Sequence, residues 1–457
     1  MLIISCLFLL NFLAPTILGL GNVPDQVHLA FTGDLTEMAV VWNTYEDASQ
    51  DVSYTKQGSS DQKQAKGSSE QWVYNGIIRY KHKAVMVGLD YDAKYDYSIA
   101  SRSFTFKTLP KDPSSYRVCV FGDLGYWHGN STESIIRHGL AGNFDFIVHL
   151  GDIAYDLHSQ NGQVGDDYMN QFEPLISTMP YMVIAGNHED DYQNFTNYQK
   201  RFVMPNNGYG DNQFYSFNLG PVHWVGVSTE NYGYYYQYGM EPVFTQYNWL
   251  KADLTEANKP ANRAVRPWIF TFQHRPFYCS NVNSAECQSF ENKIVRTGWL
   301  NMPGLEALYL QNSVDMGFWG HEHSYERFYP IADRTYYNDP SAYINPKAPV
   351  YLISGSAGCH TPDAEFTKTP WPWSAVRNND YGYSILTVAN STHIHLEQIS
   401  IDKNEQNVDD FWVIKNAGFQ YQHSESVRIG AKKFPPQKCH IRDLPCMRTL
   451  QQINEEL

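Results

Sequence analysis

Residues 144–155, "FDFIVHLGDIAY", show a pattern from which the rest of the chain can be interpreted: an apolar run that ends in glycine and aspartate. A short, nearly continuous apolar run is typical of a strand buried on both faces, as in a parallel sheet. Asp152 and Tyr155 follow this strand at once. The stretch therefore predicts a core strand that carries polar side chains at its carboxyl end.

The same pattern recurs along the chain. Four further apolar runs end in polar residues: "RVCVFGD" (117–123), "YMVIAGN" (181–187), "PWIFTFQH" (267–274) and "VDMGFWGH" (314–321). Segments with helical periodicity lie between them, at 170–179, 245–258 and 304–314. Strands that alternate with helices over this length predict an α/β domain, which we place at residues 115–415.

Five polar clusters stand where these runs stop. They contain Asp123, Asp152 with Tyr155, Asn187 to Glu189, His274, and His321 with His323. A single Gly-Asp pair is usually a turn, and two histidines two residues apart prove little. In α/β sheets, however, ligands bind beyond the carboxyl ends of the strands, so five such ends can converge on one site. We expect the glycine that precedes four of these clusters to let the backbone turn sharply.

The donor set in these clusters indicates metal binding. It consists of Asp123, Asp152, Tyr155, Asn187, His274, His321 and His323. Hard oxygen donors and imidazoles without a thiolate suit Fe, Mn or Zn. Seven donors exceed the needs of one tetrahedral zinc, and they suit two metals that share a carboxylate and keep open positions. The alternative for Tyr155 is a core aromatic, since the chain has 33 tyrosines. His128, His158 and His360 are expected in surface or core roles.

Residues 22–109 differ in pattern. Short alternating runs, such as "QVHLAFT" (26–32) and "MAVVWNT" (38–44), are separated by turn-rich gaps. This predicts a fibronectin type III-like β-sandwich. It holds no cluster of ligand or catalytic residue types, so we expect a structural role. Residues 416–457 are more polar and are expected to form a C-terminal extension.

The N-terminal segment, residues 1–21, is apolar and ends in small residues, which predicts a signal peptide. The alternative is a retained membrane anchor, because no Lys or Arg lies near Met1; no later segment is apolar enough to span a bilayer. Sequons at Asn130, Asn194 and Asn390 predict glycosylation. We expect a secreted (extracellular) or lysosomal protein.

Removal of the signal peptide would take Cys6 and leave six cysteines, an even number that suits an oxidising compartment. Cys279 with Cys287, and Cys439 with Cys446, are candidate disulfide pairs that would close small loops. Cys119 is expected as a buried strand thiol that need not pair.

Charge limits the range of partners. The formal net charge is −14, and no cluster of Lys or Arg is present, which argues against a nucleic-acid surface. An anionic substrate would therefore need a local positive centre. The oligomeric state is not indicated.

The order "GD…GD…GNHE…H…GHxH" resembles that of the metallophosphoesterase superfamily, and it spans Asp123 to His323. Serine/threonine phosphatases of that superfamily have histidine where this chain has Gly125. Tyr155, three residues after Asp152, instead resembles the iron ligand of purple acid phosphatases. "FQHRPFYCSN", "GHEHSYER" and "GSAGC" are similar to the long animal form of that family. The resemblance implies a catalytic domain of two packed sheets flanked by helices.

The resemblance also implies roles for the clustered residues. Asp123, Asp152, Tyr155 and His323 would bind Fe(III); Asp152, Asn187, His274 and His321 would bind a divalent Zn, Fe or Mn. His188 would be catalytic, Glu189 would orient it, and Asn187, Glu189, Arg275 and Tyr278 would contact substrate.

The implied reaction is hydrolysis of phosphate monoesters by in-line attack of a metal-bound hydroxide. The alternatives are a related metallophosphoesterase acting on nucleotides or phosphodiesters, and a secreted iron-binding or adhesion protein with a vestigial site.

Overall fold

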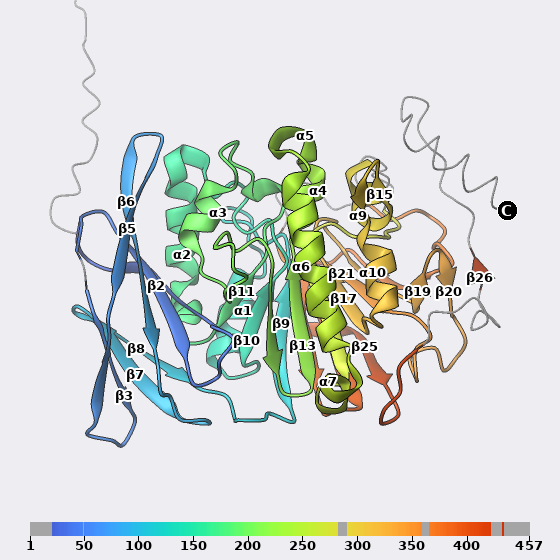
Figure 1. Ribbon diagram of the computed structural model, residues 1–457, viewed down its shortest axis with the longest axis horizontal. Helices are drawn as coiled ribbons and strands as arrows, with labels where there is room; N and C mark the ends of the chain where they lie inside the picture. The colour runs from blue at the N-terminus through green and yellow to red at the C-terminus, as the bar shows by residue number, and fades with distance from the viewer. Residues whose placement is uncertain (1–20, 49, 282–289, 359–364, 422–431, 434–457) are drawn as a thin grey trace, which may run out of the picture.

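The structure is a computed structural model that describes residues 21–48, 50–281, 290–358, 365–421 and 432–433. A small all-β part precedes a larger part in which sheets and helices alternate (Figure 1). The predicted two-domain organisation, a β-sandwich followed by an α/β domain, is confirmed. The predicted signal peptide lies outside the described residues, except for Gly21.

The N-terminal domain is a sandwich of two four-stranded antiparallel sheets. One sheet has the order β1 (Asp25–Ala30), β2 (Met38–Thr44), β6 (Ile77–Met86) and β5 (Ser68–Tyr74). The other has the order β4 (Gln62–Ala65), β3 (Val52–Lys56), β7 (Lys94–Ile99) and β8 (Arg102–Lys107). Alternating side chains, such as Tyr95 and Tyr97, fill the space between the sheets.

Two larger sheets form the centre of the α/β domain. The six-stranded sheet has the order β11 (Tyr181–Val183), β10 (Phe146–His149), β9 (Tyr116–Phe121), β23 (Gly382–Val388), β24 (His393–Ser400) and β25 (Gln406–Ile414). The seven-stranded sheet has the order β12 (Tyr215–Leu219), β13 (Val222–Val227), β14 (Trp268–Gln273), β17 (Met316–Trp319), β21 (Val350–Ser354), β18 (Tyr325–Phe328) and β22 (Ser374–Asn378).

Within these sheets the predicted apolar runs are parallel core strands. β9, β10 and β11 are parallel neighbours, and so are β13, β14, β17 and β21. Every residue of β10, β14 and β17 is buried. The polar residues that follow β9, β10, β11, β14 and β17 therefore leave their sheets at carboxyl ends.

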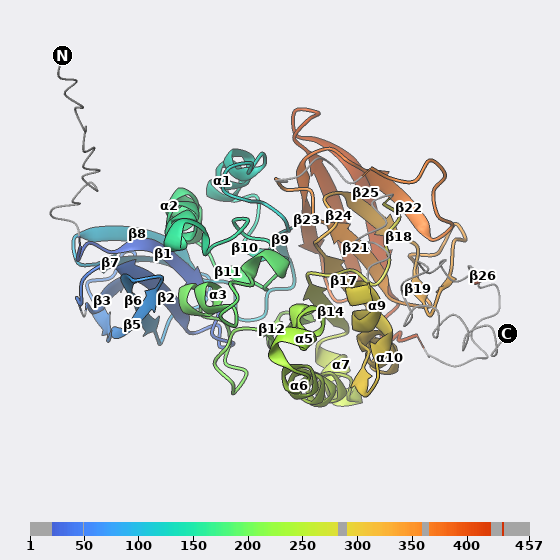
Figure 2. The same cartoon turned by 90° about the horizontal axis from the view of Figure 1, so that it is seen from above.

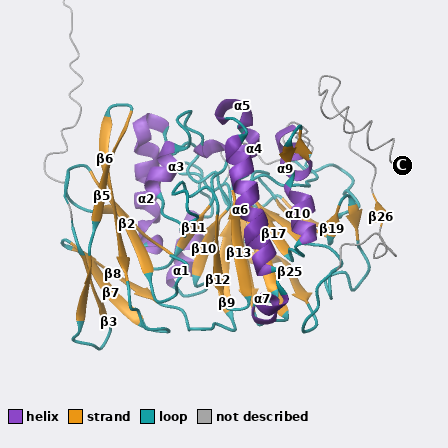
Figure 3. Cartoon of the chain, viewed as in Figure 1, coloured by secondary structure: helices purple, strands orange, loops and turns teal. Residues whose placement is uncertain are grey.

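Helices cover the outer faces of the sheets (Figures 2 and 3). The main ones are α1 (Thr132–Leu140), α2 (Gln163–Ile176), α3 (Thr196–Arg201), α6 (Glu241–Ala257), α7 (Pro260–Val265), α9 (Phe290–Thr297) and α10 (Leu305–Gln311). In α6 the buried residues Val243, Gln246, Leu250 and Leu254 recur every three or four positions, so one stripe of the helix packs on the seven-stranded sheet.

Short elements complete the domain. They are η1 (Ser159–Gly162), η2 (Asn187–Glu189), α4 (Glu230–Gly233), α5 (Tyr235–Tyr238), β15 (Gly298–Trp299), β16 (Met302–Pro303), β19 (Ile331–Ala332), β20 (Thr335–Tyr336) and β26 (Lys432–Lys433). The predicted C-terminal extension starts against the α/β domain, where the buried Tyr421 donates a hydrogen bond to the carbonyl of Val314.

Helix α2 lies between the sandwich and the six-stranded sheet (Figure 2). Its buried Asp166 accepts hydrogen bonds from Arg79 of β6 and from Arg201 of α3, both at 2.7 Å. Nearby, Glu173 accepts the backbone N–H of Val27 at 2.8 Å. The Arg79–Asp166 ion pair and the hydrogen bond from Val27 to Glu173 are buried and join the two domains.

Among the described residues, no helix is long and apolar enough to cross a membrane.

Candidate metal centre

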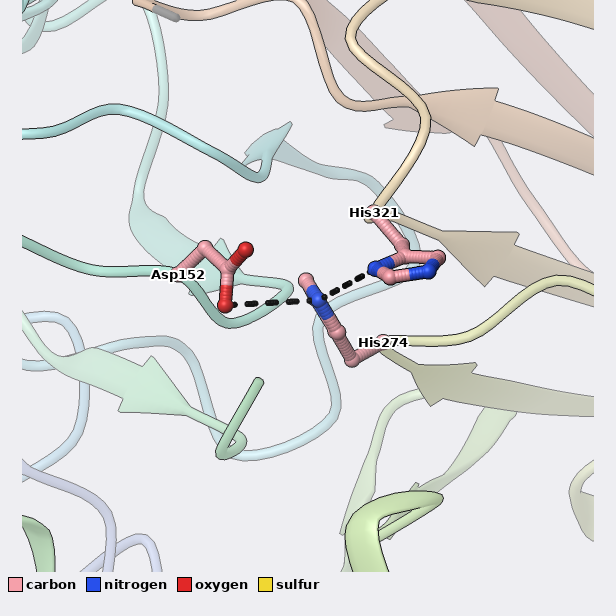
Figure 4. Close-up of side chains that lie close together, drawn as sticks. All are labelled: Asp152, His274 and His321. Atoms are coloured by element: carbon pink, nitrogen blue, oxygen red, sulfur yellow. Dashed lines mark hydrogen bonds and ion pairs between the residues drawn. The ribbon is translucent and has the colours of Figure 1, made fainter. Parts of the chain in front are cut away.

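The seven predicted metal ligands meet at the carboxyl ends of the strands that precede them. Ligand atoms of Asp152, His274 and His321 form one group, and those of Asp123, Asp152 and His323 form another, each within 4.8 Å. Figure 4 shows His274 between Asp152 and His321. Because Asp152 belongs to both groups, its carboxylate lies where a bridging ligand would be needed.

His274 is the centre of the first group. Its Nε2 atom lies 3.0 Å from Asn187 Oδ1, 3.2 Å from His321 Nδ1 and 3.3 Å from Asp152 Oδ1. Its Nδ1–H donates to the carbonyl of Leu150 at 2.7 Å. That bond fixes the ring so that Nε2 faces the other donors, as in a metal-binding histidine oriented through its second nitrogen.

In the second group, Tyr155 and Asp123 both lie close to His323. The Tyr155 hydroxyl lies 2.6 Å from His323 Nε2, which in turn lies 3.5 Å from Asp123 Oδ1. Asp123 is fully buried, and its Oδ1 atom has no hydrogen-bond partner. A buried carboxylate oxygen without a partner is costly unless a cation compensates it. The donors present therefore fit a binuclear metal centre.

Four of the proposed ligands have strained backbone conformations. Asp123, Asp152, Tyr155 and His321 have φ values of 61°, 51°, 53° and 72°. Such left-handed conformations are costly for residues other than glycine, and they cluster at functional sites.

The expected role of the preceding glycines is only partly correct. Gly151 does have a positive φ, of 89°. Gly186, in contrast, has a φ of −104°, and a Cβ atom there would lie 2.3 Å from Asp152 Oδ1. At Gly186 the requirement is close approach of the backbone to the bridging carboxylate, because a side chain would occupy the position of that carboxylate.

Glu189 lies beneath the centre and supports its loops. Its carboxylate accepts the backbone N–H groups of Asp152, Ile153 and Gly186 at 2.8 to 2.9 Å. The side chain is 1% exposed, and burial raises its pKa to about 7. These three hydrogen bonds all go to backbone groups, so they support a structural role for Glu189, and its contact with substrate and its orientation of His188 remain predictions.

His188 is oriented by Asp156, whose Oδ1 lies 2.9 Å from His188 Nδ1. The side chain of His188 is 36% exposed, and its ring packs on the ring of Tyr155 at 4.5 Å. Burial would lower the pKa of His188, but the charges of Asp152 and Asp156 outweigh it and raise the pKa to about 9. A partly exposed cation thus stands beside the ligands.

The buried ligands differ in the direction and cause of their pKa shifts. Burial raises the pKa of Asp123. Burial opposes ionisation of Asp152 too, but the charges of His274 and His188 outweigh it and hold the pKa of Asp152 well below its usual value. For His274, burial is outweighed by Asp152, and the pKa rises to about 10. His274 must lose this proton before it can bind a metal.

Of the other two predicted substrate contacts, Arg275 lies beside the ligand groups and Tyr278 lies apart from them. Arg275 forms a forked ion pair with the buried Glu230, at 2.8 to 3.0 Å, and its Nη1 lies 3.5 Å from His321 Nε2. It therefore borders the centre. The hydroxyl of Tyr278 donates to Glu306 and accepts the backbone N–H of Arg334. Tyr278 is buried in the core beneath α10, so its predicted contact with substrate is not supported.

Three residues near the centre were missed. They are Asp156, Glu230 and Tyr234. The hydroxyl of Tyr234 donates a hydrogen bond to the carbonyl of Asn187 at 3.1 Å. Asp156 follows a predicted ligand directly and could have been proposed from that position. Glu230 and Tyr234 lie in "TENYGYYYQYG" (229–239), where the sequence offers no ligand-like spacing.

Several other predictions concern residues outside the described ranges. Cys287, Cys439 and Cys446 lie there, so the two candidate disulfides remain predictions; Cys279 and Cys119 are buried, and Cys119 is free, as expected. The sequon residues Asn130, Asn194 and Asn390 are all exposed. His128 is exposed and His158 half-buried, whereas His360 is not described.

Family models match three successive parts of the chain. Residues 24–108 match "Purple acid Phosphatase, N-terminal domain", residues 116–325 match "Calcineurin-like phosphoesterase", and residues 348–410 match "Iron/zinc purple acid phosphatase-like protein C". The three matches follow the sandwich, the ligand-bearing strands and the strands β21 to β25.

Relatives and a solved structure agree with this. Acid phosphatase type 7 of Danio rerio is 40% identical over 412 residues, which cover 87% of this chain and 92% of the relative. Acid phosphatase type 7 of Homo sapiens is 40% identical over 406 residues, with coverage of 86% and 91%. A purple acid phosphatase from seeds of yellow lupin (Lupinus luteus) shares the fold, with a TM-score of 0.73 and 22% identity over 92% of this chain and 78% of that one. On these matches, and with metal-ligand geometry at the predicted strand ends, the chain belongs to the purple acid phosphatase family of metallophosphoesterases.

Proposed function

We propose that this chain is a secreted acid phosphatase that hydrolyses phosphate monoesters at a binuclear centre of Fe(III) and a divalent Zn, Fe or Mn ion. The single observation that carries the proposal is the arrangement of two donor groups around the shared carboxylate of Asp152. Asp123, Asp152, Tyr155 and His323 would hold Fe(III). Asp152, Asn187, His274 and His321 would hold the divalent ion.

When bound, the two metal ions would polarise phosphate oxygens and lower the pKa of a coordinated water, so that it attacks phosphorus in line with the leaving alcohol. The phenol of Tyr155 favours Fe(III) in the second group, because a group with an ordinary pKa near 10 ionises at acid pH only beside a strongly acidic cation. Glu189 holds the Asp152 loop and Gly186 in register through three backbone N–H groups.

His188 is the proposed proton donor to the leaving alcohol. Its Nδ1 is engaged by Asp156, so Nε2 is the nitrogen that can reach a substrate. The raised pKa, of about 9, keeps the ring protonated at acid pH, as a general acid requires. Its 36% exposure places it between the buried ligands and solvent.

Secretion rests on the apolar N-terminal segment and on the three sequons, whose asparagines are all exposed. Treatment of the protein from a eukaryotic culture medium with an endoglycosidase should increase its gel mobility. Recovery of the protein only inside the cells, with unchanged mobility, would contradict this part of the proposal.

The activity is tested by comparing p-nitrophenyl phosphate with bis-p-nitrophenyl phosphate, on protein with a measured metal content. We expect a higher kcat/KM for the monoester, with an optimum at acid pH. A preference for the diester would contradict the proposal, and so would a fully metallated protein that hydrolyses neither substrate at any pH.

A further inference from the structure

A pocket of about 330 Å³ lies where the N-terminal sandwich meets the α/β domain, and none of the proposed metal ligands lines it. Strands β5 and β6 form one wall, and residues 203–212 form the other. Figure 2 shows this second segment as the loop between α3 and β12. We refer to the cavity as the interdomain pocket. Its volume is that of pockets that bind small molecules.

Two lysines of β6, Lys81 and Lys83, line the interdomain pocket and give it a positive charge. Neither forms an ion pair with any residue that the structure describes. Glu70 also lines the pocket, but its carboxylate forms an ion pair with Lys200. In a chain with a net charge of −14, two lysines without a carboxylate partner produce a local positive potential.

Lys81 is held in place by the α/β domain. Its Nζ atom donates hydrogen bonds to the carbonyls of Gln199 and Phe202, at 3.2 and 2.9 Å. Burial, together with the like charges of neighbouring lysines, lowers the pKa of Lys81 to about 8, and burial also lowers the pKa of Lys83. Both shifts mean that the two ammonium groups are incompletely solvated, and an anion placed between them would stabilise their charges.

A second cavity adds to this positive potential. It is small and buried, and Lys81 and Arg201 both line it. The side chain of Arg201 is 5% exposed, and its Nε–H group has no hydrogen-bond partner among the described residues. A buried donor without a partner is costly, and its partial positive charge favours an anion nearby.

The wall opposite the lysines is a loop that its own asparagines hold in shape. Asn207 Oδ1 accepts the backbone N–H groups of Tyr209 and Gly210, at 2.8 and 3.0 Å. Asn212 Oδ1 accepts the backbone N–H of Met204 at 3.0 Å. Because both walls are formed before a ligand arrives, binding does not incur the entropic cost of ordering them.

We infer that the interdomain pocket binds a sulfate or phosphate group, with Lys81 and Lys83 as its charged contacts. A tetrahedral oxyanion offers several oxygens to two ammonium groups at once, through charge-assisted hydrogen bonds. A free ion fills only part of the pocket, so there is also room for a sugar that carries such a group. The inference does not depend on the proposed function, because the pocket and the metal centre share no residue.

The test measures the binding of sodium sulfate and of galactose 6-sulfate to the metal-loaded protein by isothermal titration calorimetry, at constant ionic strength and at a pH where both lysines are charged. Sulfates are used because a phosphatase would hydrolyse the corresponding phosphate ester. Lys83→Met is the main variant, since it keeps the apolar stem of a side chain that forms no ion pair. Lys66→Met, at an exposed position of the same domain, is the matched control.

We expect Lys83→Met to lower the affinity for sulfate by about tenfold or more, and Lys83→Arg, which keeps the charge, to restore most of it. Lys66→Met should bind as the wild type does. Tighter binding of galactose 6-sulfate than of free sulfate, lost in Lys83→Met, would identify a sugar ester as the ligand, and equal binding would identify the free ion.

Two outcomes would overturn the inference: a wild-type protein that binds neither sulfate compound saturably, and a Lys83→Met protein with wild-type affinity for both. Sulfate that binds at the metal centre is unaffected by Lys83→Met and would remain in every variant. The kcat/KM for p-nitrophenyl phosphate should be unchanged in Lys83→Met. A protein that binds sulfate through Lys83 but hydrolyses no phosphate ester would contradict the proposed function alone.

Discussion

The imidazole of His188 is held by the carboxylate of Asp156, with Nδ1 and Oδ1 2.9 Å apart. Asp156 directly follows Tyr155, and His188 directly follows Asn187, so two neighbours of proposed ligands form one pair. The pair links the two donor groups. The side chain of His188 is 36% exposed and that of Asp156 is 41% exposed. It therefore lies at the boundary between the buried ligands and solvent.

Asp156→Asn should lower the pKa of His188 from about 9 toward its ordinary value near 6.5, since it removes one of the two charges that raise it. A general acid works only when protonated, so the alkaline limb of the kcat/KM profile should move to lower pH. We expect a loss of about tenfold at pH 7 and a smaller loss at pH 5. Asp167→Asn, at a half-buried position of α2, is the control; an unshifted limb would argue against His188 as the acid.

His321 and His323 should differ in the metal that their loss removes. His321 lies in the donor group of Asp152 and His274, whereas His323 lies in that of Asp123 and Tyr155. We expect His321→Ala to lower the affinity for the divalent ion, and His323→Ala to lower the affinity for iron, each by at least tenfold. The purified variants should therefore lack the divalent ion and iron, respectively. Metal analysis of the purified variants checks this; equal loss of both metals in both variants would contradict the assignment.

Glu189→Ala should weaken the fold and the metal centre together. It leaves the backbone N–H groups of Asp152, Ile153 and Gly186 without their carboxylate. Each buried donor left unpaired costs about 1–3 kcal/mol, so for the three donors we expect a loss of roughly 3–9 kcal/mol in unfolding free energy. Urea unfolding with and without chelator measures it. Glu133→Ala, at an exposed position of α1, should change the unfolding free energy by less than about 0.5 kcal/mol. A Glu189→Ala protein as stable as wild type would refute the supporting role.

Asp25 should make stability depend on pH. Burial, and then the charge of Asp166, raise its pKa from 3.8 to about 7. The native state therefore binds the proton more tightly than the unfolded chain, and this contribution to stability is lost as pH rises from about 4 to 7. Asp25→Asn should be more stable than wild type by about 1–3 kcal/mol at pH 7.5, with little difference at pH 4. Urea unfolding at both values checks this, with Asp61→Asn as an exposed control; a variant less stable at pH 7.5 would contradict it.

Local patterns in the sequence were sufficient to predict the core strands and the positions of the proposed ligands at their carboxyl ends. Fully apolar runs such as β10 and β14 need burial on both faces, so they predict core strands, and the polar residues after them must lie at carboxyl ends. The partners of side chains were harder to predict. Glu189 bonds to backbone groups 36 and 37 residues away, and Arg275 to Glu230 across 45 residues. No sequence spacing expresses such contacts.

The error about Gly186 has a similar origin. From sequence, a glycine before a ligand suggests a sharp turn of the backbone. In the structure, the limiting factor is an atom from another loop, Asp152 Oδ1, which would lie 2.3 Å from an added Cβ. Steric exclusion by residues distant in sequence becomes visible only once the loops are brought together.

The central claim is that Tyr155 binds Fe(III) beside a second metal. The most direct test is a visible absorption spectrum of the purified protein, recorded with metal analysis and phosphatase assays of the same sample. We predict a tyrosinate-to-iron charge-transfer band that Tyr155→Phe abolishes and that Tyr126→Phe, a neighbouring half-buried tyrosine, preserves. A colourless protein without iron that still hydrolyses phosphate monoesters at full rate would contradict the claim.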